Sequence, residues 1–417
     1  MLTVNQLTLT HRKDLTVLVD SLSFTLNDGE RLALIGEEGN GKSTLLRVLA
    51  GDPSVESYIE VSGSFSCRDS AAYLPQELPE SERTLSAYDF FCMSPVFFDQ
   101  SPRELGELAA RLSLPADVFY SDQLMQTFSG GERVKLQLAR LLMSSPTTLL
   151  LDEPTNDLDS DSVLWLENFL LSCKLTVLFV SHDEALLSRT ATSILLLERL
   201  RRRQVPRATL YRMGYDQFYA ERGAAFEKQT RIARKEREDF DAKMERYDAI
   251  RRKVERDQNA ISRQDPHGSR LLKKKMHTVQ AMGRRFEREQ ENMTAMPEQE
   301  EAIFAKLDCA PLPADKTVLD LSCAELSVGG RTLCRNIRLT VRANEKLCIC
   351  GHNGVGKSTL LHLIRDALEK RADLRVFYMP QDAGDLLDFS LSPVELLSPS
   401  GEKEERSRAG ILLGSMK

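Results

Sequence analysis

A glycine-rich segment, GEEGNGKST, lies between two apolar runs near the start of the chain. The residues before it, RLALI, predict a strand, and the residues after it, LLRVLAG, predict a helix. A glycine-rich loop in this setting cradles phosphates with its backbone N–H groups, while its lysine reaches the outer phosphates and its serine holds magnesium. The sequence therefore predicts an α/β fold that binds a nucleotide through Gly36, Gly39, Asn40, Gly41, Lys42, Ser43 and Thr44.

Residues 128–159 contain two further candidate loops around one predicted helix and one predicted strand. The motif FSGGE places Ser129, Gly130, Gly131 and Glu132 at a helix start, where free N–H groups and the helix dipole favour an anion. An apolar run then predicts a buried strand that ends at Asp152 and Glu153. Paired carboxylates there suit one metal ligand and one base for an attacking water. A solvated turn after a core strand is the alternative interpretation.

Two more polar residues follow predicted strands. Gln76 comes after the short run AAYL, and His182 comes directly after LTVLFV. His182 also lies 29 positions after Glu153, and a strand end is where ligands bind in parallel α/β sheets. This placement favours contact with a γ-phosphate over the ordinary surface or core histidine.

The glycine-rich segment recurs 315 residues later as GHNGVGKST. The runs VLDLSCAELSVGG, LCRNIRLTV and EKLCIC predict strands before it, and YMPQ after it matches the residues that end at Gln76. The second copy thus predicts Gly351, Gly354, Gly356, Lys357, Ser358, Thr359 and Gln381 as nucleotide-binding residues, with Ser358 and Gln381 also near magnesium. Residues 386–417 predict the beginning of a helical subdomain. No second FSGGE, acidic strand end or post-strand histidine follows, so we expect a partial second copy.

The composition changes between the two copies. Residues 215–296 are strongly charged, and apolar residues at three and four spacing predict two antiparallel helices joined through NAISRQDPHGS. Residues 221–290 contain 20 Lys and Arg against 13 Asp and Glu, whereas the whole chain carries a net charge of −6. The excess gathers near the tip, at Arg263, Arg270, Lys273, Lys274 and Lys275. A basic tip favours contact with a phosphate backbone. A solvated, salt-bridged coiled coil is the alternative for the helical faces.

Length and composition limit the class of protein. The 417 residues allow two or three domains. No apolar run is long enough to span a membrane and the first residues are not a secretory signal, so we expect a cytoplasmic protein without a membrane partner. The eight cysteines form no C-x-x-C pair, and Cys348 and Cys350 fall within the predicted strand EKLCIC. Reduced thiols are therefore favoured over disulfides or zinc.

Taken together, the glycine-rich loop, Gln76, FSGGE, LLLDEP, TNDLD and His182 resemble an ATP-binding cassette. Two cassettes on one chain with a helical hairpin between them resemble the ABC-F family of translation factors, and this resemblance covers essentially the whole chain. It implies an α/β P-loop cassette with a helical subdomain in residues 1–214, a helical-hairpin arm in residues 215–310, and part of a second cassette in residues 311–417. It also implies ATP and Mg²⁺ as cofactors and ATP hydrolysis as the reaction.

The resemblance assigns roles to individual residues. Glu153 would polarise the attacking water, and Asp152 would bind magnesium. Gln76 would sense both the magnesium ion and the attacking water, and His182 would act as a γ-phosphate switch. The loop from Asn156 to Asp159 would cross to the partner cassette, which makes Asp159 a further nucleotide-site residue. The family often stacks adenine on an aromatic residue ahead of the loop. His11 and Val328 stand nearest that position in the two copies.

In cassette proteins each nucleotide is held between the phosphate loop of one half and the FSGGE-type signature of the other. Ser129 to Glu132 would then serve the ATP on Lys357, whereas Asp152 and Glu153 would serve the ATP on Lys42. Neither site is complete within the 417 residues, so we expect weak hydrolysis by a monomer. A head-to-tail homodimer would complete a site.

ABC-F membership implies binding in the ribosomal exit site, with the arm reaching toward the peptidyl-transferase centre and P-site tRNA, and antibiotic protection in some members. The partners implied are therefore rRNA and P-site tRNA. The main alternative is a cytoplasmic ATPase subunit of an ABC transporter, which predicts no long basic insertion. A DNA-repair or chromosome-structuring ATPase is a third interpretation, but its coiled coil would lie inside the cassette.

Overall fold

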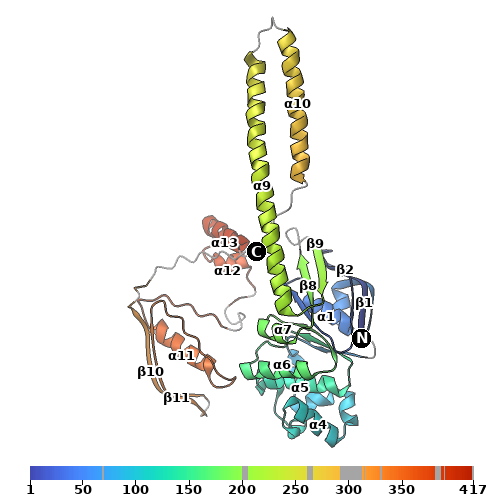
Figure 1. Cartoon of the computed structure of the whole chain (residues 1–417). Helices are drawn as coiled ribbons and strands as arrows, with labels where there is room; N and C mark the ends of the chain where they lie inside the picture. Colours follow the sequence, from blue (N-terminus) through green and yellow to red (C-terminus); the bar gives the residue numbers. More distant parts are fainter. Residues whose placement is uncertain are drawn as a thin grey trace. The chain divides into compact units, whose positions relative to one another are not determined.

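The structure is a computed structural model that describes residues 1–67, 70–199, 205–260, 266–291, 312–313, 315–328, 331–380, 387–388 and 390–415. It contains two compact units (Figure 1). The first consists of Met1–Glu198, Pro206–Leu210 and Glu300–Lys417, and the second of Arg199–Val205 and Tyr211–Gln299. In the described ranges, no helix is long and apolar enough to cross a lipid bilayer.

A six-stranded sheet forms the centre of the first unit, in the order β5-β6-β7-β3-β8-β9. Its strands are β3 (Arg31–Gly36), β5 (Ala71–Leu74), β6 (Thr148–Asp152), β7 (Thr176–Val180), β8 (Ser193–Arg199) and β9 (Val205–Tyr211). The neighbours from β5 to β8 pair in parallel. Every residue of β6 and β7 is buried, as expected for inner strands of a parallel sheet that is covered on both faces.

An antiparallel sheet lies next to this core, in the order β2-β1-β4. It consists of β1 (Leu2–His11), β2 (Val17–Leu26) and β4 (Ile59–Cys67). One apolar cluster joins this sheet to helix α1 (Lys42–Ala50) and to the parallel sheet, through residues such as Leu7, Leu46, Leu34 and Leu178. Full burial of one such leucine is worth roughly 1.5–3 kcal/mol. The cluster therefore fixes β3 and α1, the two elements that flank the first glycine-rich loop.

The predicted helical subdomain is present between β5 and residue 128. It contains α2 (Glu80–Arg83), α3 (Ala87–Cys92), α4 (Pro102–Leu112) and the short 3₁₀ helices η2 (Pro95–Asp99), η3 (Ala116–Tyr120) and η4 (Met125–Thr127); η1 (Pro53–Ser57) precedes β4. Its centre is aromatic, since Phe90, Phe91 and Phe119 are all fully buried. A capping box of Ser101 and Glu104 starts α4.

Three helices connect the parallel strands and begin with side-chain caps. They are α5 (Gly130–Met143), α6 (Ser160–Ser172) and α7 (Glu184–Thr190), capped by Ser129, Asp159 and Asp183. Each cap oxygen accepts a backbone N–H of the first turn, which fixes where the helix begins. The loops that precede α5, α6 and α7 are among those in which the sequence places functional residues.

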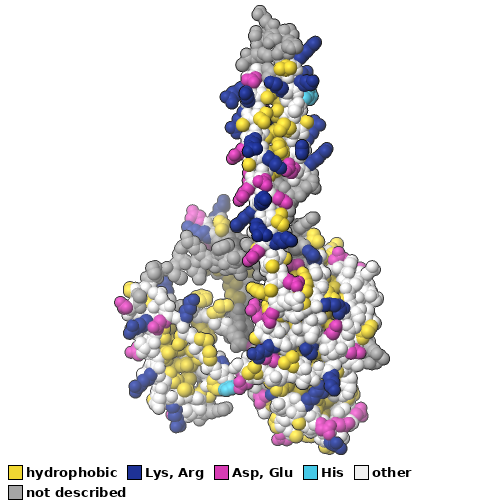
Figure 2. All heavy atoms as spheres, viewed as in Figure 1, with side chains coloured by type: hydrophobic (Ala, Val, Ile, Leu, Met, Phe, Trp, Pro, Cys, Tyr) yellow, Lys and Arg dark blue, Asp and Glu magenta, His cyan; other side chains and the backbone are white. Residues whose placement is uncertain are grey.

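The second unit contains the predicted antiparallel hairpin of α9 (Tyr215–Ala260) and α10 (Pro266–Glu291) (Figure 1). With 46 residues, α9 is on the order of 70 Å long. Phe286 of α10 packs against Phe240 and Tyr247 of α9, and Lys243 pairs with Glu289. Figure 2 shows hydrophobic side chains between the helices and many Lys and Arg side chains along their outer sides.

The second copy contains the hairpin β10 (Thr317–Val328) and β11 (Arg331–Arg342), followed by α11 (Lys357–Glu369), α12 (Pro393–Leu397) and α13 (Lys403–Ser415). The strand predicted at EKLCIC is wrong, because residues 345–350 have no regular structure and Cys348 and Cys350 are exposed. The matching strand β3 pairs with β7 and β8 in the first copy. Among the described residues after Thr317, no strand runs beside residues 345–350. The described cysteines are free thiols, as predicted.

Candidate nucleotide-binding site

Strand order brings the sequence motifs to one edge of the parallel sheet. β5, β6, β7 and β3 are neighbours and run in the same direction, so their carboxyl ends lie side by side. Gln76 follows β5, Asp152 and Glu153 end β6, His182 follows β7, and the glycine-rich loop follows β3. Ligands of parallel α/β sheets bind at such an edge.

The glycine-rich loop is held close to β8. A Cβ atom on Gly36 would lie 2.4 Å from the backbone oxygen of Leu197, so only glycine fits there. The buried Asn40 side chain donates a 3.0 Å hydrogen bond to the same oxygen and thereby anchors the loop. Lys42 Nζ donates to the backbone oxygens of Gly36 and Glu37 at 2.6 and 3.0 Å. Burial lowers the pKa of Lys42, and the nearby carboxylate of Glu153 opposes this shift.

Asp152 is held by two hydroxyl groups. Ser43 Oγ donates to Oδ1 at 3.0 Å, and the Tyr73 hydroxyl donates to Oδ2 at 3.0 Å. Arg47 Nε in turn donates to the Tyr73 oxygen at 3.4 Å. Burial raises the pKa of Asp152, whereas the hydrogen bonds from Ser43 and Tyr73 lower it. Burial also raises the pKa of Tyr73 to about 12, so its hydroxyl keeps its proton and can donate.

Glu153 is paired with the histidine of the neighbouring strand. His182 Nε2 lies 3.1 Å from Glu153 Oε1, with the carboxylate side chain 10% exposed and the imidazole 59% exposed. Burial raises the pKa of Glu153, and the charges of His182 and Lys42 oppose this shift. Glu153 also has φ of 48°, and its N–H donates to the backbone oxygen of Val180. Such backbone strain in a non-glycine residue is common at functional sites.

These residues surround a pocket of about 570 Å³. It is lined by Leu18, Glu38, Gly39, Gly41, Lys42, Ser43, Thr44, Gln76, Glu153, Asn156 and His182. The residues fit a nucleotide with Mg²⁺, since a glycine loop and Lys42 suit phosphates, and the oxygens of Ser43 and Asp152 suit a hard cation. Leu18, rather than His11, is the residue from the preceding strands that reaches this pocket. His11 instead lies 2.8 Å from Asp14.

The FSGGE motif has close partners of its own. Ser129 and Glu132 form the capping box of α5. A Cβ atom on Gly130 would lie 2.3 Å from the backbone oxygen of Asp157, and one on Gly131 would lie 2.1 Å from Ser162 Oγ. Both glycines therefore permit the start of α5 to lie against the loop and first turn of α6.

Asp159 links that loop to the second glycine-rich segment within the first unit. Its carboxylate caps α6 and accepts the N–H of Asn353 at 3.1 Å, while Asn353 Nδ2 donates to the Asp157 backbone oxygen at 2.9 Å. Hydrogen bonds from Ser162 and the Asn353 backbone lower the pKa of Asp159 to about 2. Lys357 Nζ donates to the Gly351 oxygen at 2.7 Å, which repeats the contact of Lys42 with Gly36.

The remaining predicted site residues divide into two groups. Gly351, Gly354, Gly356, Ser358 and Thr359 lie in or just after the second loop, at the start of α11. In the hairpin, Arg270 and Lys273 to Lys275 are exposed on α10. Gln381 and Arg263 lie outside the described residues.

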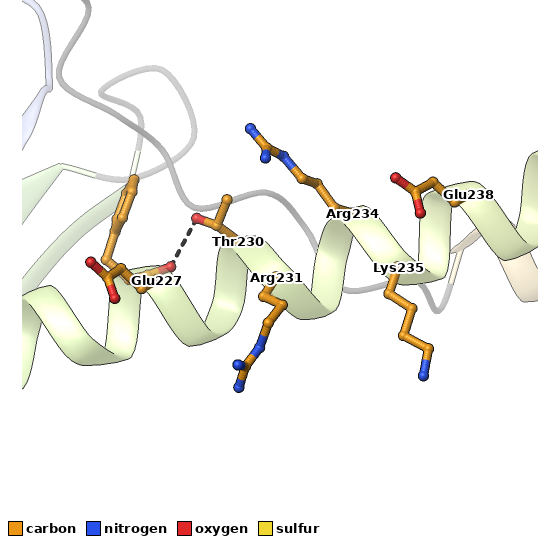
Figure 3. A pocket seen from close by; sticks show the side chains of 7 residues that line it. Glu227, Thr230, Arg231, Arg234, Lys235 and Glu238 are labelled. Carbon is orange, nitrogen blue, oxygen red and sulfur yellow. Dashed lines mark hydrogen bonds between the residues drawn. The ribbon is translucent and has the colours of Figure 1, made fainter.

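A second pocket, of about 420 Å³, lies along α9 (Figure 3). Its side chains point to different sides of the helix, with Arg231 and Lys235 on one side and Arg234 and Glu238 on another. Thr230 Oγ1 donates to the Phe226 backbone oxygen at 2.8 Å, which is a bond within the helix itself. Polar groups do not converge here, so the pocket at the sheet edge is the candidate functional site.

The chain is similar in sequence to known proteins. A family model described as "ABC transporter" matches residues 19–156 and 334–381. The chain is 30% identical over 417 residues to the tylosin resistance ATP-binding protein TlrC of Streptomyces fradiae, covering 87% of this chain and 72% of TlrC. It is 28% identical over 435 residues to ATP-binding cassette sub-family F member 3 of Homo sapiens, covering 94% of this chain but only 57% of that protein.

Among solved structures, the ATP-binding subunit of an ABC transporter aligns with a TM-score of 0.42 at 20% identity, covering 54% of this chain and 93% of that subunit. The TlrC and sub-family F alignments each span most of this chain. The chain belongs to the ABC-F family of ATP-binding cassette proteins.

Proposed function

We propose that this protein is an ATP-hydrolysing ABC-F translation factor that acts in the cytoplasm. Its family consists generally of ATPases, and the pocket at the sheet edge supplies the groups that this reaction needs. In the proposed reaction, ATP binds the glycine-rich loop, and the bond between its γ-phosphorus and the bridging oxygen is broken by water. Catalysis of this kind depends mainly on positioning and on charge stabilisation.

Each site residue has a defined task in this proposal. The loop N–H groups and Lys42 would bind the phosphates, and Ser43 and Asp152 would hold Mg²⁺, which supplies positive charge to the phosphate oxygens when bound. The Glu153 carboxylate would accept the proton of the attacking water. His182, at 3.1 Å from Glu153, would orient that carboxylate and contact the γ-phosphate. Gln76, which is exposed in the pocket, would contact the water from the β5 side.

The hairpin is the observation that carries the proposal of ribosome binding. It inserts two helices between the cassettes, with Arg270 and Lys273 to Lys275 exposed on α10. A dense positive charge on a narrow arm suits rRNA and tRNA phosphates. We therefore propose that the arm reaches toward the P-site tRNA and the peptidyl-transferase centre. The name of TlrC supports a further proposal that the protein counteracts an antibiotic bound there.

A pelleting experiment with purified ribosomes tests this function. Glu153→Gln keeps the size of the side chain but removes its capacity to accept a proton, so ATP should bind without being turned over. The variant should co-pellet with ribosomes in ATP more than the unchanged protein does, and neither should co-pellet strongly without nucleotide. Glu60→Gln, an exposed change on β4, is the matched control. Equal pelleting of both variants in ATP would reject the release step, and capture of membrane subunits instead would favour the transporter alternative.

A further inference from the structure

The helical subdomain of the first cassette carries a cluster of exposed aromatic rings. Phe98 is 66% exposed, Tyr120 is 56% exposed and Tyr88 is 39% exposed. Tyr88 and Tyr120 stack with centroids 6.4 Å apart, and each lies 6.2 Å from Phe97. Phe97 also contacts Phe98, at 5.7 Å. These rings form one cluster joined through Phe97, in contrast to the scattered apolar side chains that are normal on protein surfaces.

This aromatic surface is built on the core of the subdomain. Phe97 is 5% exposed and packs on the fully buried Phe91, with centroids 5.8 Å apart. Phe91 in turn contacts Phe119 at 4.9 Å, and Phe119 precedes Tyr120 on η3. The exposed rings are therefore held by buried neighbours, so little conformational entropy would be lost when a partner covers them.

The sequence segments that contain these rings carry charges of a single sign, between the flanking arginines Arg83, Arg103, Arg111 and Arg133. Residues 84–102 and 112–132, which contain α3, η2, η3 and η4, have no Lys or Arg. At the frequency of the whole chain, 56 Lys and Arg in 417 residues, these forty positions would contain about five. Their acidic residues include Asp89, Asp99, Asp117 and Asp122, which are all exposed and each lie within three sequence positions of an exposed ring.

We propose that this aromatic-acidic surface, defined by Tyr88, Phe98 and Tyr120 with Asp99, Asp117 and Asp122, binds a Lys- and Arg-rich polypeptide segment. Guanidinium and ammonium groups bind aromatic faces, Arg most often, and pair with carboxylates at the same time. The subdomain already binds one cation in this way, because the Arg140 guanidinium of α5 lies 3.8 Å from the Phe90 centroid and donates to Glu82 at 2.9 Å. A nucleic-acid strand would be repelled by the aspartates.

The inference goes beyond ribosome binding by the hairpin and does not depend on it. The hairpin offers positive charge to phosphates, whereas the aromatic-acidic surface offers negative charge and rings to a cationic protein chain. One molecule would thus hold two binding surfaces of opposite charge, each selective for a different class of macromolecule.

Fluorescence anisotropy with the full chain tests the proposal. The probe is a fluorescein-labelled dodecapeptide, (Arg-Ala-Leu-Arg)₃. The triple variant D99N/D117N/D122N removes charge at exposed positions, and F98S/Y120S removes two exposed rings. Each should weaken peptide binding at least fivefold at 50 mM salt. The control D20N/E56Q/E60Q removes the same charge from exposed positions of the first cassette and should change binding less than twofold.

Three outcomes would overturn the proposal. The first is equal loss in the control variant, which would show general attraction to an acidic protein. The second is unchanged peptide binding in D99N/D117N/D122N, provided that its thermal unfolding matches that of the unchanged protein. The third is loss of binding to a labelled 20-nucleotide poly-U strand in that same variant, which would show that the surface contacts nucleic acid.

Discussion

The Tyr73 hydroxyl donates a 3.0 Å hydrogen bond to Asp152 Oδ2, and this bond orients the carboxylate whose other oxygen faces Ser43. Tyr73→Phe removes the hydroxyl without removing the ring. We expect the Mg²⁺ concentration needed for half-maximal ATP binding to rise about fivefold, because one hydrogen bond of roughly 1 kcal/mol is lost. Titration of Mg²⁺ at fixed nucleotide, followed with a fluorescent ATP analogue, measures this change.

Tyr58→Phe is the matched control for that prediction, because Tyr58 also bonds to Arg47 and is not a partner of Asp152. Its Mg²⁺ dependence should stay unchanged. Nucleotide affinity in EDTA should be the same for both variants. A loss of affinity in EDTA for Tyr73→Phe alone would show that the tyrosine supports the fold of the pocket and does not position Asp152.

Gly131 is required by its close approach to Ser162. An added Cβ would meet Ser162 Oγ at 2.1 Å and Ser162 Cβ at 2.8 Å. We expect Gly131→Ala to lower the free energy of unfolding by about 1–3 kcal/mol through overpacking, although alanine is normally the better helix residue. Ser162→Gly removes both clashing atoms and should restore most of the loss. Thermal unfolding, followed by the fluorescence of Trp165, which is the single tryptophan of the chain, measures the three proteins.

Gly106→Ala is the control for this series, since a Cβ on Gly106 of α4 would meet nothing within 4 Å. It should be neutral or slightly stabilising. ATP turnover adds a second measurement. If Gly131→Ala with Ser162→Gly regains stability but not turnover, the added methyl group obstructs a phosphate at the start of α5, and the glycine serves nucleotide binding as well as the packing of α5 on α6.

Burial of Asp152 should make stability depend on pH. Burial raises its folded-state pKa above the unfolded value of about 3.9, so the folded chain retains this proton to higher pH than the unfolded chain does. The carboxyl group therefore destabilises the fold increasingly as the pH rises from its unfolded-state pKa to its folded-state pKa. Below both values the group is protonated in both states and does not change the free energy of unfolding. Asp152→Asn should be more stable than the unchanged protein at pH 7, and the difference should disappear toward pH 4. Urea midpoints at each pH measure it, and a difference independent of pH would contradict the burial effect.

Positive charge on α10 should set the salt dependence of RNA binding. Changing Arg270, Lys273, Lys274 and Lys275 to Gln should weaken binding and reduce the slope of log K against log salt by up to about 3, since each lost phosphate contact contributes roughly 0.7 to 0.9. The control changes Lys228, Arg231, Arg234 and Lys235, which are exposed on the proximal part of α9. Equal slopes for both quadruple variants would mean that the charges of α10 have no special role.

Much of the candidate site could be predicted because its motifs are local. Lys42, Ser43, Gln76, Glu153 and His182 each follow a recognisable strand, and the structure brings all five to one pocket. Leu18 and the Tyr73 to Arg47 contact could not be predicted in this way. They depend on strand order and on the register of elements far apart in the chain, which no local pattern contains.

The strand predicted at EKLCIC is absent for a related reason, because strand formation also depends on elements far apart in the chain. Its apolar pattern resembles that of β3, yet β3 exists because β7 and β8 supply hydrogen bonds on both sides. Strand propensity depends on such neighbours more than on the segment itself. Gly130 and Gly131 show the reverse case, since the sequence suggested a phosphate contact and the structure adds a packing reason for glycine.

The length of α9 makes it a mechanical lever. A rotation of about 5° around its first residue would displace its last by about 6 Å, because the helix rises 1.5 Å per residue. Figure 1 shows the described part of α10 alongside the distal part of α9. Two helices in contact bend less readily than one. Bending of α9 should therefore occur mainly in its first turns, before it lies beside α10. A small angular change at the base of the hairpin would thus become a displacement at its tip comparable to the spacing between nucleotides.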